Sequence, residues 1–139
     1  MILKVQRLSQ TAKLPTKAHE TDAGWDLYAD IDQPLFLTPN KIEIIDTGLS
    51  ISVPVGYCGM IKDKSSYGAN GDHVLAGVID TVYTGPVKVV MYSPFGRRIN
   101  PGDKFAQMLI VSVPEVEIEE VDDLNQTERG EGGFGSSGR

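Results

Sequence analysis

Residues 41–46 read KIEIID, and residues 49–53 read LSISV. In the first stretch, isoleucines alternate with charged residues, which is the period of two that a β-strand gives to its two faces. This alternation predicts a strand with one apolar face and one charged, solvated face. The same pattern recurs in VEIEEV at 116–121, where we expect a second strand of this kind.

Short stretches rich in β-branched and aromatic residues continue in both directions from this segment, separated by Gly, Pro, Asn and Asp. Many short strands with tight turns predict an all-β protein, a sandwich or barrel of jelly-roll type. A helix is favoured only at 64–70, with Asp63 or Ser65 as its cap and with Gly68 and Gly71 limiting its length. The further expected strands are 4–8, 25–29, 34–37, 57–62, 87–93 and 104–113.

The length and the distribution of charge predict one domain with a tail. A chain of 139 residues is enough for one core, and the composition changes near 124–127. We therefore expect a single β-barrel domain over 1–124 and a flexible Gly-rich arm over 125–139. The formal net charge is -6, and the six carboxylates of 115–123 account for all of it. The chain thus has no basic surface of the kind that binds nucleic acid, and we expect no such partner.

The apolar residues are too dispersed for a membrane protein, because no run approaches the roughly 18 residues that a spanning helix needs. The start, MILKVQRLSQTAKLP, has Lys4 and Arg7 where a signal peptide would be uninterrupted and apolar. These features predict a cytoplasmic or otherwise intracellular protein with no membrane contact. Cys58, the single cysteine, is expected to be a small core residue on a strand.

Three internal segments carry side chains suited to chemistry on a phosphate ester. In LAGVIDTVYTG (75–85), Asp80 could form a turn or, beside phosphates, accept a proton from water. In DKSSYG (63–68), one lysine and two serines offer a cation and hydroxyl donors to an anion. In PGDKFAQM (101–108), Gln107 is a neutral donor within an expected strand.

The C-terminal stretch RGEGGFGSSGR (129–139) is too rich in glycine to fold alone, since ordering it costs roughly 1–2 kcal/mol per residue. Its spacing G-x-G-x-x-G is not a dinucleotide fingerprint, because no helix follows within a βαβ unit. Glycine N–H groups, Arg129 and Phe134 could nevertheless wrap an anion and stack on a base. The alternative is a tail without a role.

Taken in order, five segments resemble the homotrimeric dUTPase family. They are AGWDLYA (23–29), DKSSYG (63–68), AGVIDTVYTG (76–85), PGDKFAQM (101–108) and RGEGGFGSSG (129–138). The resemblance implies a jelly-roll-like β fold and a homotrimer with active sites shared between subunits. It also implies Mg²⁺-dependent hydrolysis of dUTP to dUMP and pyrophosphate, which limits uracil in DNA and supplies dUMP for dTTP synthesis.

The resemblance also implies roles for individual residues. Asp80 is the implied base for the attacking water, and Tyr83 packs against the deoxyribose. The resemblance implies that Asp26 contacts the metal ion through a water molecule and that Mg²⁺ is held mainly by the substrate phosphates. The implied substrate-binding residues are Lys64, Ser65, Ser66, Gly77, Val78, Ile79, Tyr83 and Gln107, joined from the closing arm by Arg129, Gly133, Phe134, Gly135, Ser136 and Ser137.

Three positions depart from the family pattern. Lys64 stands where the family generally has arginine, so a point charge replaces a planar fork. Val82 and Thr84 flank the tyrosine where an acidic and a basic residue are common. Two other functions stay open at this point, a dCTP deaminase-like enzyme of the same fold and a dUTP-responsive regulatory binding protein.

Overall fold

The computed structural model describes residues 1–124, 127 and 130. Strands dominate this part of the chain, and its helix α1 is a single turn at Ser65–Gly68. No helix in these residues is long and apolar enough to cross a membrane. The strands are β1 (Lys4–Arg7), β2 (Trp25–Tyr28), β3 (Leu35–Leu37), β4 (Lys41–Ser52), β5 (Tyr57–Asp63), β6 (His73–Leu75), β7 (Val78–Ile79), β8 (Pro86–Ser93), β9 (Arg97–Ile99) and β10 (Lys104–Ser112).

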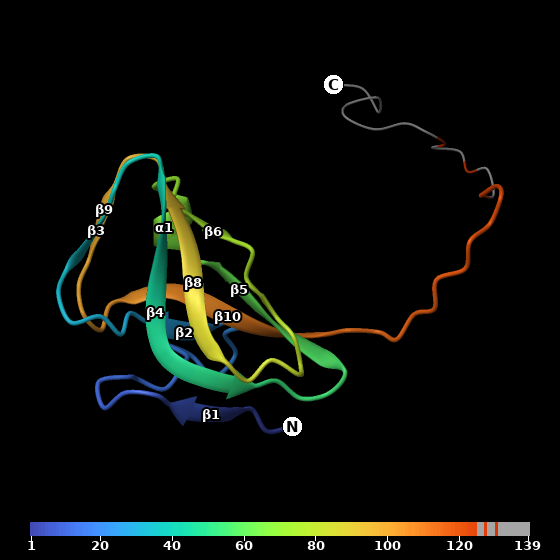
Figure 1. Cartoon of the computed structure of the whole chain (residues 1–139), viewed down its shortest axis with the longest axis horizontal. Helices are drawn as coiled ribbons and strands as arrows, with labels where there is room; N and C mark the ends of the chain where they lie inside the picture. Colours follow the sequence, from blue (N-terminus) through green and yellow to red (C-terminus); the bar gives the residue numbers. More distant parts are fainter. Residues whose placement is uncertain (125–126, 128–129, 131–139) are drawn as a thin grey trace.

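The strands form two four-stranded antiparallel sheets and a small two-stranded one. The first sheet has the order β1-β4-β8-β6, the second has the order β2-β10-β5-β7, and β3 pairs with β9. Neighbours in each sheet are distant in sequence, as expected for a jelly-roll-like fold. The long, curved β4 and the adjacent β8 form one wall of the barrel in Figure 1. The all-β prediction is therefore confirmed.

The hydrophobic core lies between the two large sheets. Along β8, buried residues alternate with exposed or half-buried ones, which places every second side chain in the core. Phe105 is the largest of the fully buried side chains, and it reaches the core from β10. Its neighbours in the core include Leu27, Ile45, Leu49, Ile51, Ile61, Val87, Val89, Met91 and Met108.

Most strand predictions were correct in type but incomplete in extent. The stretches 41–46 and 49–53 belong to one continuous strand, β4, which carries a register shift between Asp46 and Leu49. Gly48 lies at this irregularity with φ +63°, a conformation that glycine adopts without strain, so the strand continues through it. The short strands β6, β7 and β9 were not predicted. Cys58 lies on β5 as expected, but it is half-buried.

The predictions for the two alternating segments were wrong in different ways, in the faces of 41–46 and in the existence of a strand at 116–121. Ile42 and Ile44 are 59% and 63% exposed, whereas the charged Glu43 between them is half-buried. The segment 116–121 forms no strand, and Ile118 is 97% exposed. The described residues beyond β10 run away from the barrel, as the orange trace in Figure 1 shows, and find no strand partner there. Alternation alone does not supply the neighbouring strand that a ladder requires.

The helix prediction was right in place and wrong in its cap. The residue before α1 is Lys64, which has extended backbone angles and makes no capping hydrogen bond with its side chain. The Asp63 carboxylate is engaged elsewhere, because it accepts hydrogen bonds from the Val74 N–H and from the His73 ring. A contact from β6 has therefore replaced the local cap.

Candidate active site

A buried carboxylate with two lysines lies where β2, β10 and the turn before α1 meet. Asp26 on β2 is 8% exposed, and its oxygens separately contact the ammonium groups of Lys64 and Lys104. The Lys104 Nζ lies 2.8 Å from Asp26 Oδ2. Antiparallel pairing of β10 with β2 places Gln107 opposite Asp26. The fold thus joins three of the segments that the sequence singled out.

The charge of Asp26 is stabilised despite its burial. Removal from water by itself raises the pKa of this carboxyl group, but hydrogen bonds and charges from Lys104 and Lys64 outweigh that effect and lower it below the usual value. The same hydrogen bond between Lys104 and Asp26 raises the pKa of Lys104. The cluster is therefore one carboxylate and two ammonium groups near neutral pH, with a net positive charge.

Ser65 and Ser66 lie exposed immediately after Lys64. Gln107 is anchored beside this turn, because its Nε2 donates to the Asp63 carbonyl oxygen over 2.8 Å. The absence of a side chain at Gly24 leaves room for Gln107, because a Cβ atom at position 24 would overlap Gln107 Oε1. We call Asp26, Lys64, Ser65, Ser66, Lys104 and Gln107 the lysine–serine cluster. Its cations and hydroxyl groups are suited to bind a polyanion.

A second group of predicted residues lies in β7 and in the tight turn that leads from it to β8, two strands that belong to different sheets. Gly77 has φ +96°, and a Cβ there would lie 2.8 Å from the Ile61 carbonyl oxygen, so glycine is required. The Gly77 carbonyl oxygen accepts a 2.8 Å hydrogen bond from the Ile61 N–H, which fixes Val78 and Ile79 beside β5. We call the segment 76–85 the hairpin.

Asp80 and Tyr83 occupy the tip of the hairpin. The Tyr83 N–H donates to the Asp80 carbonyl oxygen over 3.1 Å, which closes the turn. The Tyr83 hydroxyl donates to the Pro86 carbonyl oxygen over 2.8 Å, and the Thr81 hydroxyl donates to the Val53 carbonyl oxygen over 2.9 Å. Asp80 is exposed, and the described residues provide it with no ion pair. Its carboxylate is thus accessible on an ordered turn.

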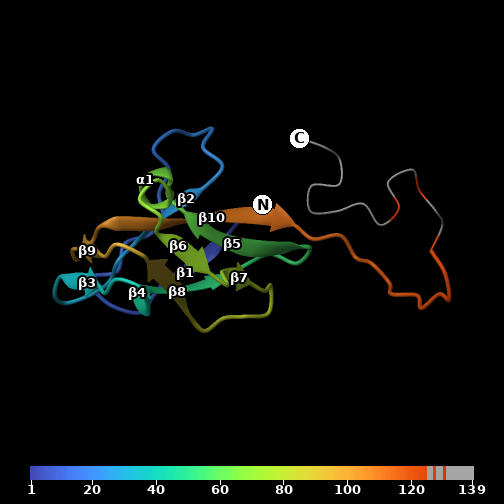
Figure 2. The same cartoon turned by 90° about the horizontal axis from the view of Figure 1, so that it is seen from above.

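The lysine–serine cluster and the hairpin tip are separated within one chain. Ile79 lies opposite Gly59 on β5, whereas Lys64 follows the far end of the same strand. The five residue steps from 59 to 64 span roughly 16 Å at about 3.3 Å per step. Figure 2 shows α1 beyond the arrowhead of β5 and β7 alongside its other half. The fold therefore brings together only part of the predicted site.

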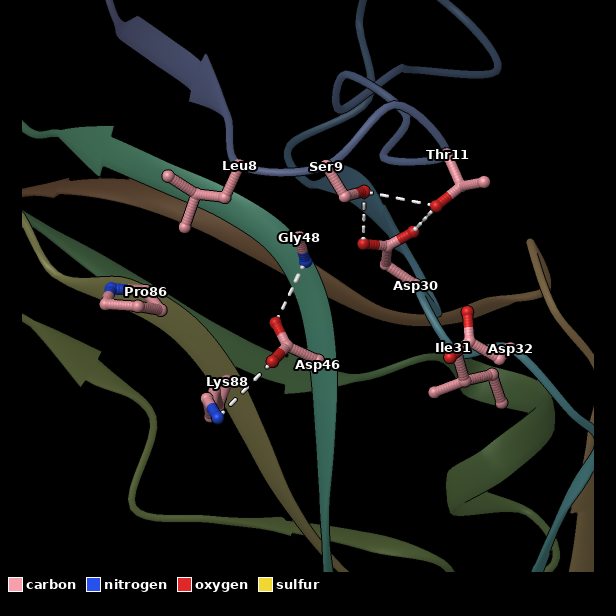
Figure 3. A pocket seen from close by; sticks show the side chains of 10 residues that line it. All are labelled: Leu8, Ser9, Thr11, Asp30, Ile31, Asp32, Asp46, Gly48, Pro86 and Lys88. Carbon is pink, nitrogen blue, oxygen red and sulfur yellow. Dashed lines mark hydrogen bonds and ion pairs between the residues drawn. The ribbon is translucent and has the colours of Figure 1, made fainter.

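The pocket drawn in Figure 3 shares no residue with either group. It encloses about 350 Å³, and its polar side chains largely satisfy one another. Asp30 accepts 2.6 Å hydrogen bonds from the Ser9 and Thr11 hydroxyls, and Asp46 contacts the Gly48 N–H and the Lys88 ammonium group. Because two of its three carboxylates, those of Asp30 and Asp46, are already paired in this way, the pocket is a poor candidate for the active site.

Asp26 suits a metal ion only as an outer ligand. Both of its oxygens hold ammonium groups, and no set of three His, Cys, Asp or Glu side chains converges within the described part of the chain. Direct coordination of a metal ion by Asp26 would require one of its oxygens to give up its contact with a lysine ammonium group. The residues therefore fit an ion that phosphate oxygens hold and that Asp26 contacts through water.

The predictions for the arm fall on residues outside the described part: Arg129, Gly133, Phe134, Gly135, Ser136 and Ser137. Sequence reasoning missed Lys104 as a member of the lysine–serine cluster. Pairing the expected strands 25–29 and 104–113 could have found it, because their antiparallel register brings Lys104 opposite Tyr28 and near Asp26.

A jelly-roll-like barrel with an anion-binding cluster and a separate, exposed acidic hairpin defines a class of small all-β proteins suited to phosphorylated ligands. Comparison with known proteins identifies the group within this class. The family model described as dUTPase matches residues 10–138. The chain belongs to the dUTPase family.

Relatives and solved structures agree with this assignment over nearly the full length. The deoxyuridine 5'-triphosphate nucleotidohydrolase of Yarrowia lipolytica is 41% identical and aligns over 99% of this chain and 90% of its own length. The enzyme of the same name from Anaplasma marginale is 42% identical, with 98% and 97% covered. The structure of Staphylococcus bacteriophage 80alpha dUTPase with dUPNHPP superposes with a TM-score of 0.86 at 28% identity, covering 99% of both chains.

A further structural neighbour is described with a metal. It is a mutant dUTPase from phage phi11 of S. aureus, with a TM-score of 0.80 at 25% identity over 88% of this chain and 98% of its own. That protein is described as coordinating a structural Mg(II) ion.

Proposed function

We propose that this protein hydrolyses dUTP to dUMP and pyrophosphate, and that it does so as a homotrimer whose active sites are shared between subunits. Membership of the dUTPase family supports the reaction. The oxygen of a water molecule attacks the α-phosphorus, the bond from that phosphorus to the α,β-bridging oxygen breaks, and pyrophosphate leaves.

One observation carries the proposal of a shared site. The lysine–serine cluster and Asp80 lie near opposite ends of β5, separated by roughly 16 Å of strand. Consecutive phosphorus atoms of a triphosphate are joined through single oxygens, so the three phosphates are much shorter than this. One chain therefore cannot place its own cluster on the phosphates and its own Asp80 at the attacked phosphorus. A second subunit can supply the missing half.

The exposed apolar face of β4 supports assembly. Ile42 and Ile44 point outward, opposite Tyr92 and Val90 on β8, and both isoleucines are more than half exposed. Apolar side chains clustered on one sheet face usually mark a protein contact. Burial of this face in a homotrimer would stabilise the assembly and would provide the neighbouring subunits that a shared site requires.

The hairpin contributes the base of the reaction and the recognition of the nucleoside. The Asp80 carboxylate accepts a proton from the attacking water, and the exposure of Asp80 leaves space for water and substrate. The backbone around Gly77, Val78 and Ile79 presents a fixed edge of donors and acceptors to uracil. The Tyr83 ring packs against the deoxyribose, and its hydroxyl bond to Pro86 holds the ring in place.

The lysine–serine cluster binds the phosphates. Ser65 and Ser66 donate from their hydroxyl groups, Gln107 donates from its side-chain amide, and Lys64 contributes charge. Asp26 keeps Lys64 and Lys104 oriented before substrate arrives, so less side-chain freedom is lost on binding. In the arm, Arg129 and Phe134 remain predicted contacts that close over the phosphates and the base.

We include Mg²⁺ as the cofactor. When bound, it would neutralise charge on the triphosphate oxygens. Asp26 would orient a water molecule of its outer shell, since both carboxylate oxygens are engaged by lysines. The family assignment does not favour the alternatives of a deaminase or of a regulatory binding protein. A cytoplasmic or otherwise intracellular location stays a prediction from sequence.

Mixed trimers test the proposal. One variant carries Asp80→Asn, and the other carries alanine at Lys64, Ser65 and Ser66, which are exposed or half-buried and outside the core. Each alone should be trimeric and nearly inactive on dUTP. After refolding together in equal amounts, about a quarter of the sites should combine an intact Asp80 with an intact cluster from a neighbour, restoring about a quarter of the wild-type rate.

The control carries all four substitutions on one chain and is mixed with wild type in equal amounts, where shared sites should again keep about a quarter of the wild-type rate, whereas sites built within one chain would keep about half. A wild-type protein inactive on dUTP would reject the proposed reaction. Wild-type activity without recovery in mixed trimers, with mixing verified by native mass spectrometry, would reject the shared site and leave the reaction standing.

A further inference from the structure

The turn that carries Ser65 and Ser66 is not stabilised by its own sequence. Helix α1 has four residues, and its cap residue makes no side-chain hydrogen bond. A helix this short does not form alone, because nucleation is unfavourable and few backbone hydrogen bonds follow. The Tyr67 and Gly68 N–H groups both donate to the Lys64 carbonyl oxygen over 2.9 Å. Contacts from outside the turn must therefore hold it.

The first of these contacts begins at Asp72, which is 1% exposed. Its carboxylate accepts hydrogen bonds from the Ser93 hydroxyl at 2.6 Å and from Arg97 Nε at 2.5 Å. The same guanidinium donates through Nη2 to the Ser66 carbonyl oxygen over 3.2 Å and lies 4.1 Å from the centre of the Tyr67 ring. A buried carboxylate thus fixes an arginine fork, and the fork fixes the backbone of Ser66.

The second contact begins at the next residue, His73. Its Nδ1 donates to Asp63 Oδ2 over 2.9 Å, and the other oxygen of Asp63 accepts the Val74 N–H. Asp63 immediately precedes Lys64, and its carbonyl oxygen accepts the 2.8 Å hydrogen bond from Gln107. One aspartate therefore connects the start of β6 both to the beginning of the turn and to Gln107.

From these contacts we infer that Asp72 and His73 are positioning residues for the phosphate-binding turn, acting through Arg97 on Ser66 and through Asp63 on Lys64 and Gln107. The inference rests on the proposed function for the identity of the ligand. Neither residue needs to touch substrate. Because displacing a binding group by about 1 Å can cost about 10²-fold in rate, a partial displacement of this turn should lower turnover by roughly 10-fold.

Variants of His73 and Arg97 separate positioning from folding. His73→Ala removes the donor to Asp63, whereas His73→Asn retains a nitrogen attached to Cγ that can donate in its place. Arg97→Lys keeps a cation beside Asp72 but lacks the fork that also reaches Ser66. The matched control is His19→Ala, which removes a histidine whose Nδ1 lies 3.5 Å from Asp22 on an exposed loop.

With dUTP, we expect His73→Ala and Arg97→Lys to lower kcat about 10-fold, whereas His73→Asn and His19→Ala stay within about twofold of wild type. Inhibition by dUMP should change little, because the hairpin contributes most of its recognition. A purely structural defect would instead lower thermal stability and weaken dUMP binding together. Loss of activity in His73→Asn equal to that in His73→Ala would overturn the role of the Asp63 contact.

Hydrogen exchange gives a readout that does not depend on turnover. Amide exchange at Tyr67 and Gly68 should be at least about fivefold faster in His73→Ala and Arg97→Lys, with Ile45 and Val89 in the core unchanged. Unchanged exchange at the turn rejects the inference. If wild type fails to hydrolyse dUTP while exchange responds as expected, the proposed function is wrong and the structural coupling stands. Faster exchange with unaltered kcat rejects the catalytic consequence.

Discussion

Asp26 and Asp80 lie in opposite surroundings. Asp26 is 8% exposed and holds two ammonium groups, whereas Asp80 is exposed and has no ion-pair partner among the described residues. The first carboxylate is already neutralised by charges from its own chain. The second is free to accept a proton or a hydrogen bond from a ligand.

This difference separates two functions that carboxylates have in sites for phosphorylated ligands. A carboxylate paired with lysines orients cations and is a weak base, because its charged form is stabilised and its pKa is lowered. An exposed carboxylate on an ordered turn can accept a proton from water. Variants at Asp80 and in the hairpin should therefore change turnover and substrate preference, whereas variants at Asp26 and its lysines should change the pH dependence of stability and kcat/KM.

Asp80→Asn should have the largest effect. General-base assistance contributes about 10²–10⁴-fold, so turnover of dUTP should fall by at least about 10²-fold while the fold and substrate affinity persist. Steady-state pyrophosphate release together with binding of a non-hydrolysable dUTP analogue measures the two quantities separately. Asp32→Asn is the matched control, since Asp32 is also exposed but lies in the pocket of Figure 3. Unchanged turnover in Asp80→Asn would remove this residue from the mechanism.

Tyr83 should govern the choice of sugar. Tyr83→Ala removes the ring that would occupy the space of a ribose 2′-hydroxyl, and the preference in kcat/KM for dUTP over UTP should fall about 10-fold. Tyr83→Phe loses the 2.8 Å hydrogen bond to the Pro86 carbonyl oxygen but keeps the ring, so its preference should stay near that of wild type. Equal preferences in wild type and Tyr83→Ala would show that the sugar is selected elsewhere.

The sequence predicted the all-β class and singled out the residues of both groups except Lys104, because short strands and ordered motifs are local properties. It did not predict that Asp63 would bond to His73 and Val74 in preference to capping α1, since that contact depends on the position of β6. The separation of Asp80 from Lys64 likewise follows from the β5–β7 register, which no single motif contains.

The inverted face of β4 illustrates another limit of sequence reasoning. Alternation in KIEIID correctly predicts a strand, but it does not say which side the core will cover. Ile45, which breaks the alternation, is the residue that is fully buried, whereas Ile42 and Ile44 face outward. The pattern identified a strand whose apolar outer face the single chain does not cover.

Asp26→Asn should change the response to acid. The folded pKa of Asp26 lies below the ordinary value of 3.8, so its charged form stabilises the native state above about pH 4. That stabilisation is lost as the pH falls through the lower folded pKa. The free energy of unfolding should therefore depend less steeply on pH below about 4 in Asp26→Asn than in wild type, as measured by urea denaturation. Asp32→Asn, which removes an exposed carboxylate with no ion pair among the described residues, is the matched control.

Lys64→Arg should have the smallest effect and sharpens the description of the lysine–serine cluster. The resemblance noted in the sequence implies arginine at this position, and its planar fork can contact a carboxylate or phosphate through two parallel hydrogen bonds. Asp26 has a second cation in Lys104, so the carboxylate stays paired whichever way the new side chain turns. We therefore expect kcat/KM for dUTP to be unchanged or to rise, by no more than about threefold.

Lys64→Met provides the contrast, because it keeps the unbranched side chain and removes the charge. If the cation matters through its charge, methionine should lower kcat/KM while arginine does not. If the compact ammonium group is needed to fit beside Lys104 on one carboxylate, Lys64→Arg should instead lower kcat/KM by more than about tenfold. KM should then rise, and the free energy of unfolding should depend less steeply on pH below about 4. That result would mean that Asp26 accommodates two ammonium groups but not a guanidinium group. Lys104→Arg should then cause the same loss, because Lys104 contacts the other carboxylate oxygen of Asp26.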